Sequence, residues 1–124
     1  MTVLVDTHTL FWLLSGDKRL SQRARFACRR ADGLVIPAIV VLELFYLLKK
    51  LNMVNDFNGI FVKLKTDAKY AIISIDLAVL DASVALADRL EMHDASIAAT
   101  AQILNLPIVT KDSQIKKVYK KTIW

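Results

Sequence analysis

The stretch TVLVDTHTLFWLL (residues 2–14) sets the pattern for the whole chain. Its first four residues are short, β-branched and apolar, which predicts a buried strand over 2–6. The residues after Asp6 predict a helix near 8–14. Asp6 is therefore expected at a turn between a strand and a helix.

A second segment repeats this arrangement near the end of the chain. Residues 107–110 (PIVT) predict a short buried strand, and residues 113–120 predict the helix that follows it, with Asp112 between the two. If both strands are parallel in one sheet, the carboxylates of Asp6 and Asp112 emerge at the same edge. Open α/β sheets bind their ligands at that edge.

Two further acids stand in apolar surroundings. Glu43 lies in AIVVLELFYLL (residues 38–48), a helical segment that is apolar around its circumference and is therefore expected to be largely buried. A buried ionised carboxylate is costly unless it is paired, hydrogen-bonded or bound to a cation. Asp94 opens the helical segment 94–105, whose small residues suit close packing, and its side chain is expected to point out of the first turn.

Each acid also has a simpler interpretation. Asp6, Asp94 and Asp112 could each cap a helix N-terminus, and Glu43 could meet a buried Arg or reach solvent. Together, however, four converging carboxylates would repel one another and raise their pKa values unless a cation offset the charge. Hard oxygen donors, without an obvious pair of His ligands, favour Mg²⁺ or Mn²⁺ over Zn²⁺ or copper.

The remaining segments alternate strands with helices, which predicts an α/β fold with a mainly parallel sheet covered on both faces. The expected strands are 2–6, 34–36, 71–75, 107–110 and 122–124. The expected helices are 8–14, 21–31, 39–51, 54–66, 77–90, 94–105 and 113–120.

These residues carry a resemblance to a known family. The opening VDTHTLFWLLSGD (residues 5–17) followed by Leu20-Ser21 resembles the start of PIN-domain proteins, and most of all the VapC toxins of VapBC toxin–antitoxin pairs. Glu43-Leu44 is similar to the second acidic motif of that family, residues 94–101 (DASIAATA) to the third, and Thr110-Lys111-Asp112 to the fourth. The four motifs occur in the family's order over essentially the whole chain.

The resemblance implies a three-layer α/β/α fold with about four or five central strands, formed by a single PIN domain over 1–124. It implies a metal-dependent endoribonuclease whose four acids Asp6, Glu43, Asp94 and Asp112 are catalytic and hold one or two Mg²⁺ or Mn²⁺ ions. It also implies a VapB-like antitoxin that inhibits the enzyme.

Three residues beside the acids are candidates for orienting them. The Thr7 and Thr110 hydroxyls could position a carboxylate or a bound water, or they could bond only to the turn backbone. Before Asp94 the chain has Leu90-Glu91-Met92-His93 where a common subfamily has a His, Asp and Pro pattern. Glu91 is either a peripheral metal or orienting group or a solvated surface residue, and His8 and His93 are expected to be structural.

Composition bounds the remaining possibilities. At 124 residues with 55% hydrophobic residues and a mean hydropathy of +0.39, the chain is expected to form one domain and to pair as a homodimer. Phe45, Leu48 and Phe61 are candidates for that interface. The apolar run 34–48 is too short to span a membrane and contains Pro37 and Glu43.

Charge and cysteine content suggest the setting. The chain has no secretory pattern at its start and a single cysteine, Cys28, which together favour the cytoplasm and a role for that cysteine as a small core residue. The net charge of +5 and the pI near 9.5 would attract RNA. Three hypotheses therefore stand: a VapC-like toxin, a PIN nuclease of RNA processing without an antitoxin, and a non-enzymatic PIN-like module whose acids only cap helices.

Overall fold

The protein is built around one sheet of five parallel strands. The computed structural model describes all of residues 1–124, and the strand order across the sheet is β3-β2-β1-β4-β5. All four strand pairings are parallel, as the alternation of strands and helices predicted. The strands are β1 (Thr2–Val5), β2 (Gly33–Pro37), β3 (Tyr70–Ile73), β4 (Ile108–Val109) and β5 (Thr122–Ile123).

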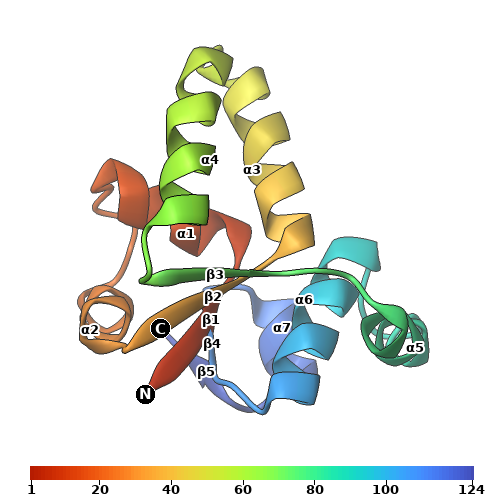
Figure 1. Cartoon of the computed structure of the whole chain (residues 1–124). Helices are drawn as coiled ribbons and strands as arrows, with labels where there is room; N and C mark the ends of the chain where they lie inside the picture. Colours follow the sequence, from red (N-terminus) through yellow and green to blue (C-terminus); the bar gives the residue numbers. More distant parts are fainter.

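Helices cover both faces of this sheet, which gives the expected three-layer α/β/α fold. In Figure 1, α1 and α2 lie on one side of the strands and α6 and α7 on the other, with α5 outside α6. The antiparallel-looking pair α3 and α4 stands beyond the β3 edge. The helices are α1 (Thr7–Ser15), α2 (Gln22–Arg30), α3 (Ala38–Lys50), the 3-10 turn η1 (Val54–Asp56), α4 (Phe57–Thr66), α5 (Leu77–Ala85), α6 (Met92–Leu104) and α7 (Ser113–Val118).

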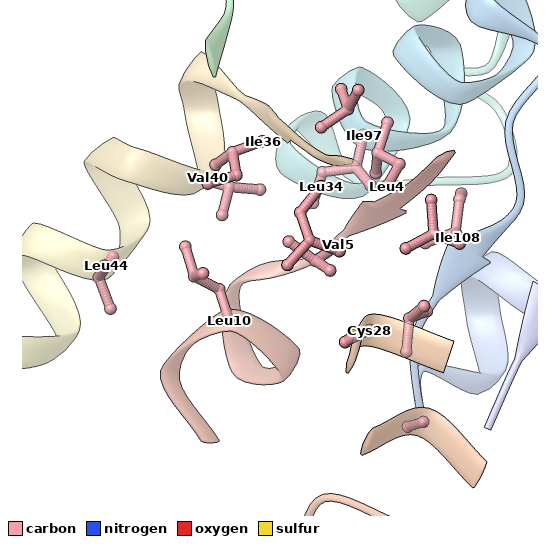
Figure 2. Close-up of a cluster of buried hydrophobic side chains, with 14 of the residues drawn as sticks. Leu4, Val5, Leu10, Cys28, Leu34, Ile36, Val40, Leu44, Ile97 and Ile108 are labelled. Atoms are coloured by element: carbon pink, nitrogen blue, oxygen red, sulfur yellow. The ribbon is translucent and has the colours of Figure 1, made fainter. Parts of the chain in front are cut away.

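The central strands are continuous apolar runs in the sequence because both of their faces are buried in the core. Val3, Leu4 and Val5 of β1 are fully buried, because helices pack on both faces and neither face of the strand meets water. Figure 2 shows Leu4 and Val5 in one cluster of buried side chains with Leu10 of α1, Val40 and Leu44 of α3 and Ile97 of α6.

Several of the predicted elements have different limits in the structure; the strand expected over 71–75 is β3 (Tyr70–Ile73), and the helix expected over 113–120 ends at Val118. The expected helix 54–66 is divided into η1 and α4, and the expected helix 77–90 ends at Ala85 in a series of turns. The helix expected to open at Asp94 begins at Met92, because the Glu91 side chain caps it by accepting the Asp94 N–H at 2.8 Å. Asp94 therefore lies in the first turn.

The prediction that the Glu43 helix is largely buried was wrong for one of its faces. Val40, Val41, Leu44 and Leu48 of α3 are buried, whereas Leu42 and Tyr46 are more than half exposed. An apolar circumference does not by itself enclose a helix, and here β2, α1, η1, α4 and α6 contact α3 without covering all of its faces. Leu48 is only 1% exposed, so it is a core residue and is not available to an interface between two copies.

Candidate active site

The candidate site lies at the carboxyl edge of the parallel sheet. Asp6 directly follows β1, and Thr110 directly follows β4, two residues before Asp112. Because β1 and β4 are hydrogen-bonded neighbours, their ends place Asp6 and Thr110 side by side. The sheet thereby brings together two acids that are 106 positions apart in the sequence.

The Thr110 hydroxyl joins these two acids. It donates a hydrogen bond to Asp6 Oδ2 and accepts one from the Asp112 N–H at 3.0 Å. Thr110 is completely buried and Asp6 nearly so, so both bonds are sheltered from water. The remaining oxygen of Asp6 accepts the Thr9 N–H at 2.9 Å, which caps α1.

A second set of bonds fixes Glu43. The Thr7 hydroxyl donates to Glu43 Oε1 at 2.8 Å, across from α1 to α3. His93 Nδ1 lies 4.0 Å from Glu43 Oε2 and 3.1 Å from Glu91 Oε2. Glu43 therefore lies next to a hydroxyl and an imidazole. The simpler interpretation in which Glu43 pairs with a buried Arg is wrong.

Asp94 carries the clearest electrostatic signature of the site. Its partial burial and, in decreasing order, the negative charges of Asp112, Glu91, Glu43 and Asp6 together raise its pKa from 3.8 to about 7. The pKa of Glu91 moves the other way. Partial burial raises it, but the Asp94 N–H and the His93 imidazole stabilise the carboxylate and lower the pKa overall.

The side chains match a hard divalent cation in chemistry, although they do not form a finished coordination sphere. As they stand, no three His, Cys, Asp or Glu side chains are grouped so that they could hold a metal ion. Asp112 uses Oδ1 to cap α7, and Asp6 uses both oxygens in hydrogen bonds. Each carboxylate oxygen has two lone pairs, so these bonds leave acceptor capacity. Positive charge placed among the acids would also relieve the repulsion at Asp94.

An open hollow adjoins the acids. It encloses about 350 Å³ and is lined by Asp6, His8, Trp12, Lys111 and Asp112. The exposed imidazole of His8 packs at a tilt on Trp12, with 5.4 Å between ring centroids. Lys111 places a positive side chain next to Asp112, so the hollow offers an anionic substrate both charge and an aromatic wall.

The structure places the sequence candidates unevenly around this edge. Asp6, Asp112 and Thr110 form one hydrogen-bonded group, and Glu43, Thr7 and Glu91 form another with His93. Both threonines bond to acids, and Glu91 caps α6 while remaining exposed. His93, which was expected to be structural, lies between the carboxylates of Glu43 and Glu91. Its position next to the third acidic motif was the only signal of this contact in the sequence.

Taken together, these features define a parallel three-layer α/β/α protein with an acidic site at the carboxyl edge of its sheet. The PIN domain model matches residues 3–121, and the chain belongs to the PIN-domain family. PIN domains are generally nucleases. No curated protein matches the sequence.

Solved structures share the fold at low sequence identity. The chain aligns with a toxin–antitoxin complex from Klebsiella pneumoniae at a TM-score of 0.72 and 23% identity, over 98% of this chain and 96% of the other. VapBC2 from Rickettsia felis, bound to a DNA fragment from its promoter, gives 0.72 and 17% over 100% of both chains. FitAcB from Neisseria gonorrhoeae gives 0.63 and 20%, over 93% and 91%. The VapC-like fold predicted from the motifs is confirmed.

Proposed function

We propose that the protein is a metal-dependent endoribonuclease and the toxin of a VapBC-type pair, with residues 1–124 as its single catalytic domain. The observation that supports the proposal is that the negative charges of Asp112, Glu43 and Asp6, which come from three other segments, all raise the pKa of Asp94. The non-enzymatic alternative, in which the acids only cap helices, does not explain Glu43 and Asp94, because neither caps a helix.

In this proposal the four acids hold Mg²⁺ or Mn²⁺ at the carboxyl edge. A bound divalent cation supplies a water of lowered pKa and positive charge beside the phosphoryl oxygens. Thr110 holds Asp6 in place from the neighbouring strand end, and Thr7 does the same for Glu43 from α1. His93 Nδ1–H donates to Glu91 Oε2 at 3.1 Å and so orients that carboxylate, while Glu43 Oε2 lies 4.0 Å from the same nitrogen.

The rest of the hollow would receive the RNA strand. Lys111 lies where it can neutralise a phosphate on the approach to Asp6 and Asp112. The exposed imidazole of His8, which packs on the buried Trp12 ring, offers a ring for stacking with a base. The net charge of +5 favours approach of the polyanion as a whole. Surface charge thus binds the substrate, and the acidic edge cuts it.

The proposed partner is a VapB-like antitoxin that covers the hollow. The similar solved structures come from toxin–antitoxin complexes, which supports this choice over an RNA-processing nuclease that has no antitoxin. We also propose that the protein is a homodimer and acts in the cytoplasm, where the buried, unpaired Cys28 would stay reduced. None of the helices has the length and apolar content needed to cross a membrane.

The experiment that tests the function compares the protein with Asp94→Asn on total RNA, each with Mg²⁺, Mn²⁺ or EDTA and without antitoxin. We expect discrete products only with metal and a loss of at least a hundredfold in the variant, because Asn removes a ligand charge at nearly constant volume. A circular dichroism melt shows whether the variant is folded. Cleavage that persists in folded Asp94→Asn, or in EDTA, would contradict the metal-centre role.

A further inference from the structure

A second pocket lies at the opposite edge of the sheet from the acids. It encloses about 490 Å³, and its wall includes Leu34 near the start of β2 and Tyr70 at the start of β3. Gly16, which ends α1, also lines it. Because α1 begins beside Asp6 and its nine residues rise about 14 Å, the helix separates this pocket from the candidate active site.

Positive charge distinguishes this pocket. Arg25 and Arg29 of α2, Lys63 of α4 and Lys69 before β3 line it, and no Asp or Glu does. None of these four cations belongs to a salt bridge of the chain. The charges of Arg25 and Lys69 reach Asp17 and Asp32, but these carboxylates pair instead with Arg19 and with the N-terminal ammonium.

Two of the four cationic side chains are held by hydrogen bonds within the protein, and the other two are not. Arg25 donates to the Asp17 carbonyl at 2.9 Å, and Lys69 donates to the carbonyls of Ala31 and Arg29. The head groups of Arg29 and Lys63 make no hydrogen bond in the protein, and both residues are exposed. A ligand would thus meet two positioned cations and two that can close on it.

The remaining wall adds no negative charge at neutral pH. Burial raises the pKa of the Cys28 thiol to about 11 and also raises the pKa of the Tyr70 phenol, so both stay neutral. The carboxyl end of α1 opposes an anion, but its Trp12 carbonyl is already bonded to the N–H groups of Gly16 and Asp17. Leu13, Leu14 and Leu34 supply an apolar surface beside the cations.

We propose that this pocket is a second binding site, which takes a phosphate group with two or more negative charges and an apolar or aromatic part attached to it. Four unpaired cations repel one another, and a multivalent anion offsets that repulsion. Guanidinium groups also bind phosphate oxygens through paired N–H donors. A free nucleotide and the phosphorylated end of an RNA chain both present this chemistry.

The first test titrates the full-length chain with inorganic pyrophosphate in EDTA and follows backbone amide signals by NMR. EDTA prevents pyrophosphate from reaching the acids through a bound cation. We expect saturable shifts at Gly16 and Tyr70, and an affinity about tenfold weaker in each of Arg29→Gln and Lys63→Gln. The matched controls are Arg30→Gln on the same helix as Arg29 and Lys65→Gln on the same helix as Lys63, because neither residue lines the pocket. Absent shifts, or equal losses in the controls, would overturn the proposal.

The second test distinguishes the two sources of phosphate. ADP and a short RNA with a 5′-phosphate each compete against pyrophosphate, with the same RNA carrying a 5′-hydroxyl as the reference. Displacement by ADP or by the 5′-phosphate RNA supports the site and identifies its source, whereas displacement by neither refutes it. Because no divalent cation is present and Asp94→Asn should bind normally, this result does not depend on the proposed nuclease activity.

Discussion

A single carboxylate, Asp94, links the stability of this protein to its chemistry. Its pKa of about 7 means that, without metal, this side chain titrates near neutral pH, whereas most surface carboxylates are ionised well below that. Burial is the largest cause, and the neighbouring acids add to it. Burial and the neighbouring charges both disfavour the ionised form of Asp94, and the proposed divalent cation would favour it.

The first prediction concerns the pH dependence of stability in EDTA. A raised pKa means that folded Asp94 keeps its proton after the unfolded chain has lost it, so stability falls as pH rises from about 4 through about 7. After allowance for solvent screening of this half-exposed group, the fall is roughly 1–2 kcal/mol. Thermal melts across this range should show the fall in the protein and not in Asp94→Asn.

The control lies in a separate pH window. The Arg19 side chain lowers the pKa of Asp17 to about 2, so the contribution of Asp17 is lost only as pH falls below about 4. A melting temperature that stays level or rises between pH 4 and 7 would show that ionisation of Asp94 does not destabilise the fold. Mn²⁺ added at pH 7 should restore the lost stability of the unmodified protein and release protons.

The second prediction concerns the Thr110 hydroxyl. Thr110→Val keeps the side-chain shape but leaves the Asp112 N–H without its acceptor and Asp6 Oδ2 without its donor. We expect a loss of about 2 kcal/mol in the free energy of unfolding and at least a tenfold loss of RNA cleavage. Denaturant titration and the cleavage assay measure the two effects.

Thr9→Val is the matched control for this change. The Thr9 hydroxyl is also buried and donates to the Val109 carbonyl at 2.8 Å, but it touches no acid of the site. It should therefore lose comparable stability and keep its cleavage activity. If both variants lose activity equally, Thr110 acts only through the general stability of the strand end, and its orienting role is refuted.

At the scale of elements, the sequence located the strands and the acids that follow them. The buried runs 2–5 and 108–109 and their following acids were predictable because both faces of a parallel strand are covered, so the apolar run stops where the sheet ends. The start of α6 was not predictable in the same way. Asp is a preferred N-cap residue and Glu is not, so the sequence predicted that the helix opens at Asp94. In the structure, the Glu91 side chain supplies the cap.

The third prediction follows from that cap. Glu91→Ala removes the hydrogen bond to the Asp94 N–H and a negative charge near Asp94, so it should cost about 1 kcal/mol and move the Asp94 titration to lower pH. Asp76→Ala removes the equivalent cap of α5, where Asp76 accepts the Val79 N–H at 2.9 Å. It should cost a similar amount without moving that titration.

Carboxyl carbon signals in NMR report the Asp94 titration, and denaturant titration reports the stability. Glu91→Gln separates the two effects, because the amide oxygen can still accept the Asp94 N–H while the charge is gone. An Asp94 titration that is identical in the protein and in both Glu91 variants would mean that Glu91 acts on stability alone.

At the scale of the whole molecule, several large apolar side chains remain exposed on the surface. Leu77 and Val84 of α5 are 80% and 74% exposed, and Met92 at the start of α6 is 69% exposed. Leu80 and Val84 line a groove of about 410 Å³ that reaches Glu91. The sequence suggested an interface from overall hydropathy and named Phe45, Leu48 and Phe61 as its candidates, whereas the most exposed apolar side chains, Leu77 and Val84, lie on α5. Which residues of an apolar helix face the core depends on the neighbours that pack against it, as Leu48 shows.

The last prediction places the proposed homodimer interface on α5 and tests it with Val84→Glu. Because Val84 is 74% exposed in one copy, the charge should leave the folded monomer intact, yet burying it between two copies would be prohibitive. We expect light scattering coupled to size exclusion to show a dimer for the protein and a monomer for the variant. Phe26→Glu is the control, since Phe26 is 63% exposed on α2, in the layer on the other side of the sheet. If the dimer survives the Val84→Glu substitution but dissociates with the Phe26→Glu substitution, the interface lies on α2 and not on α5.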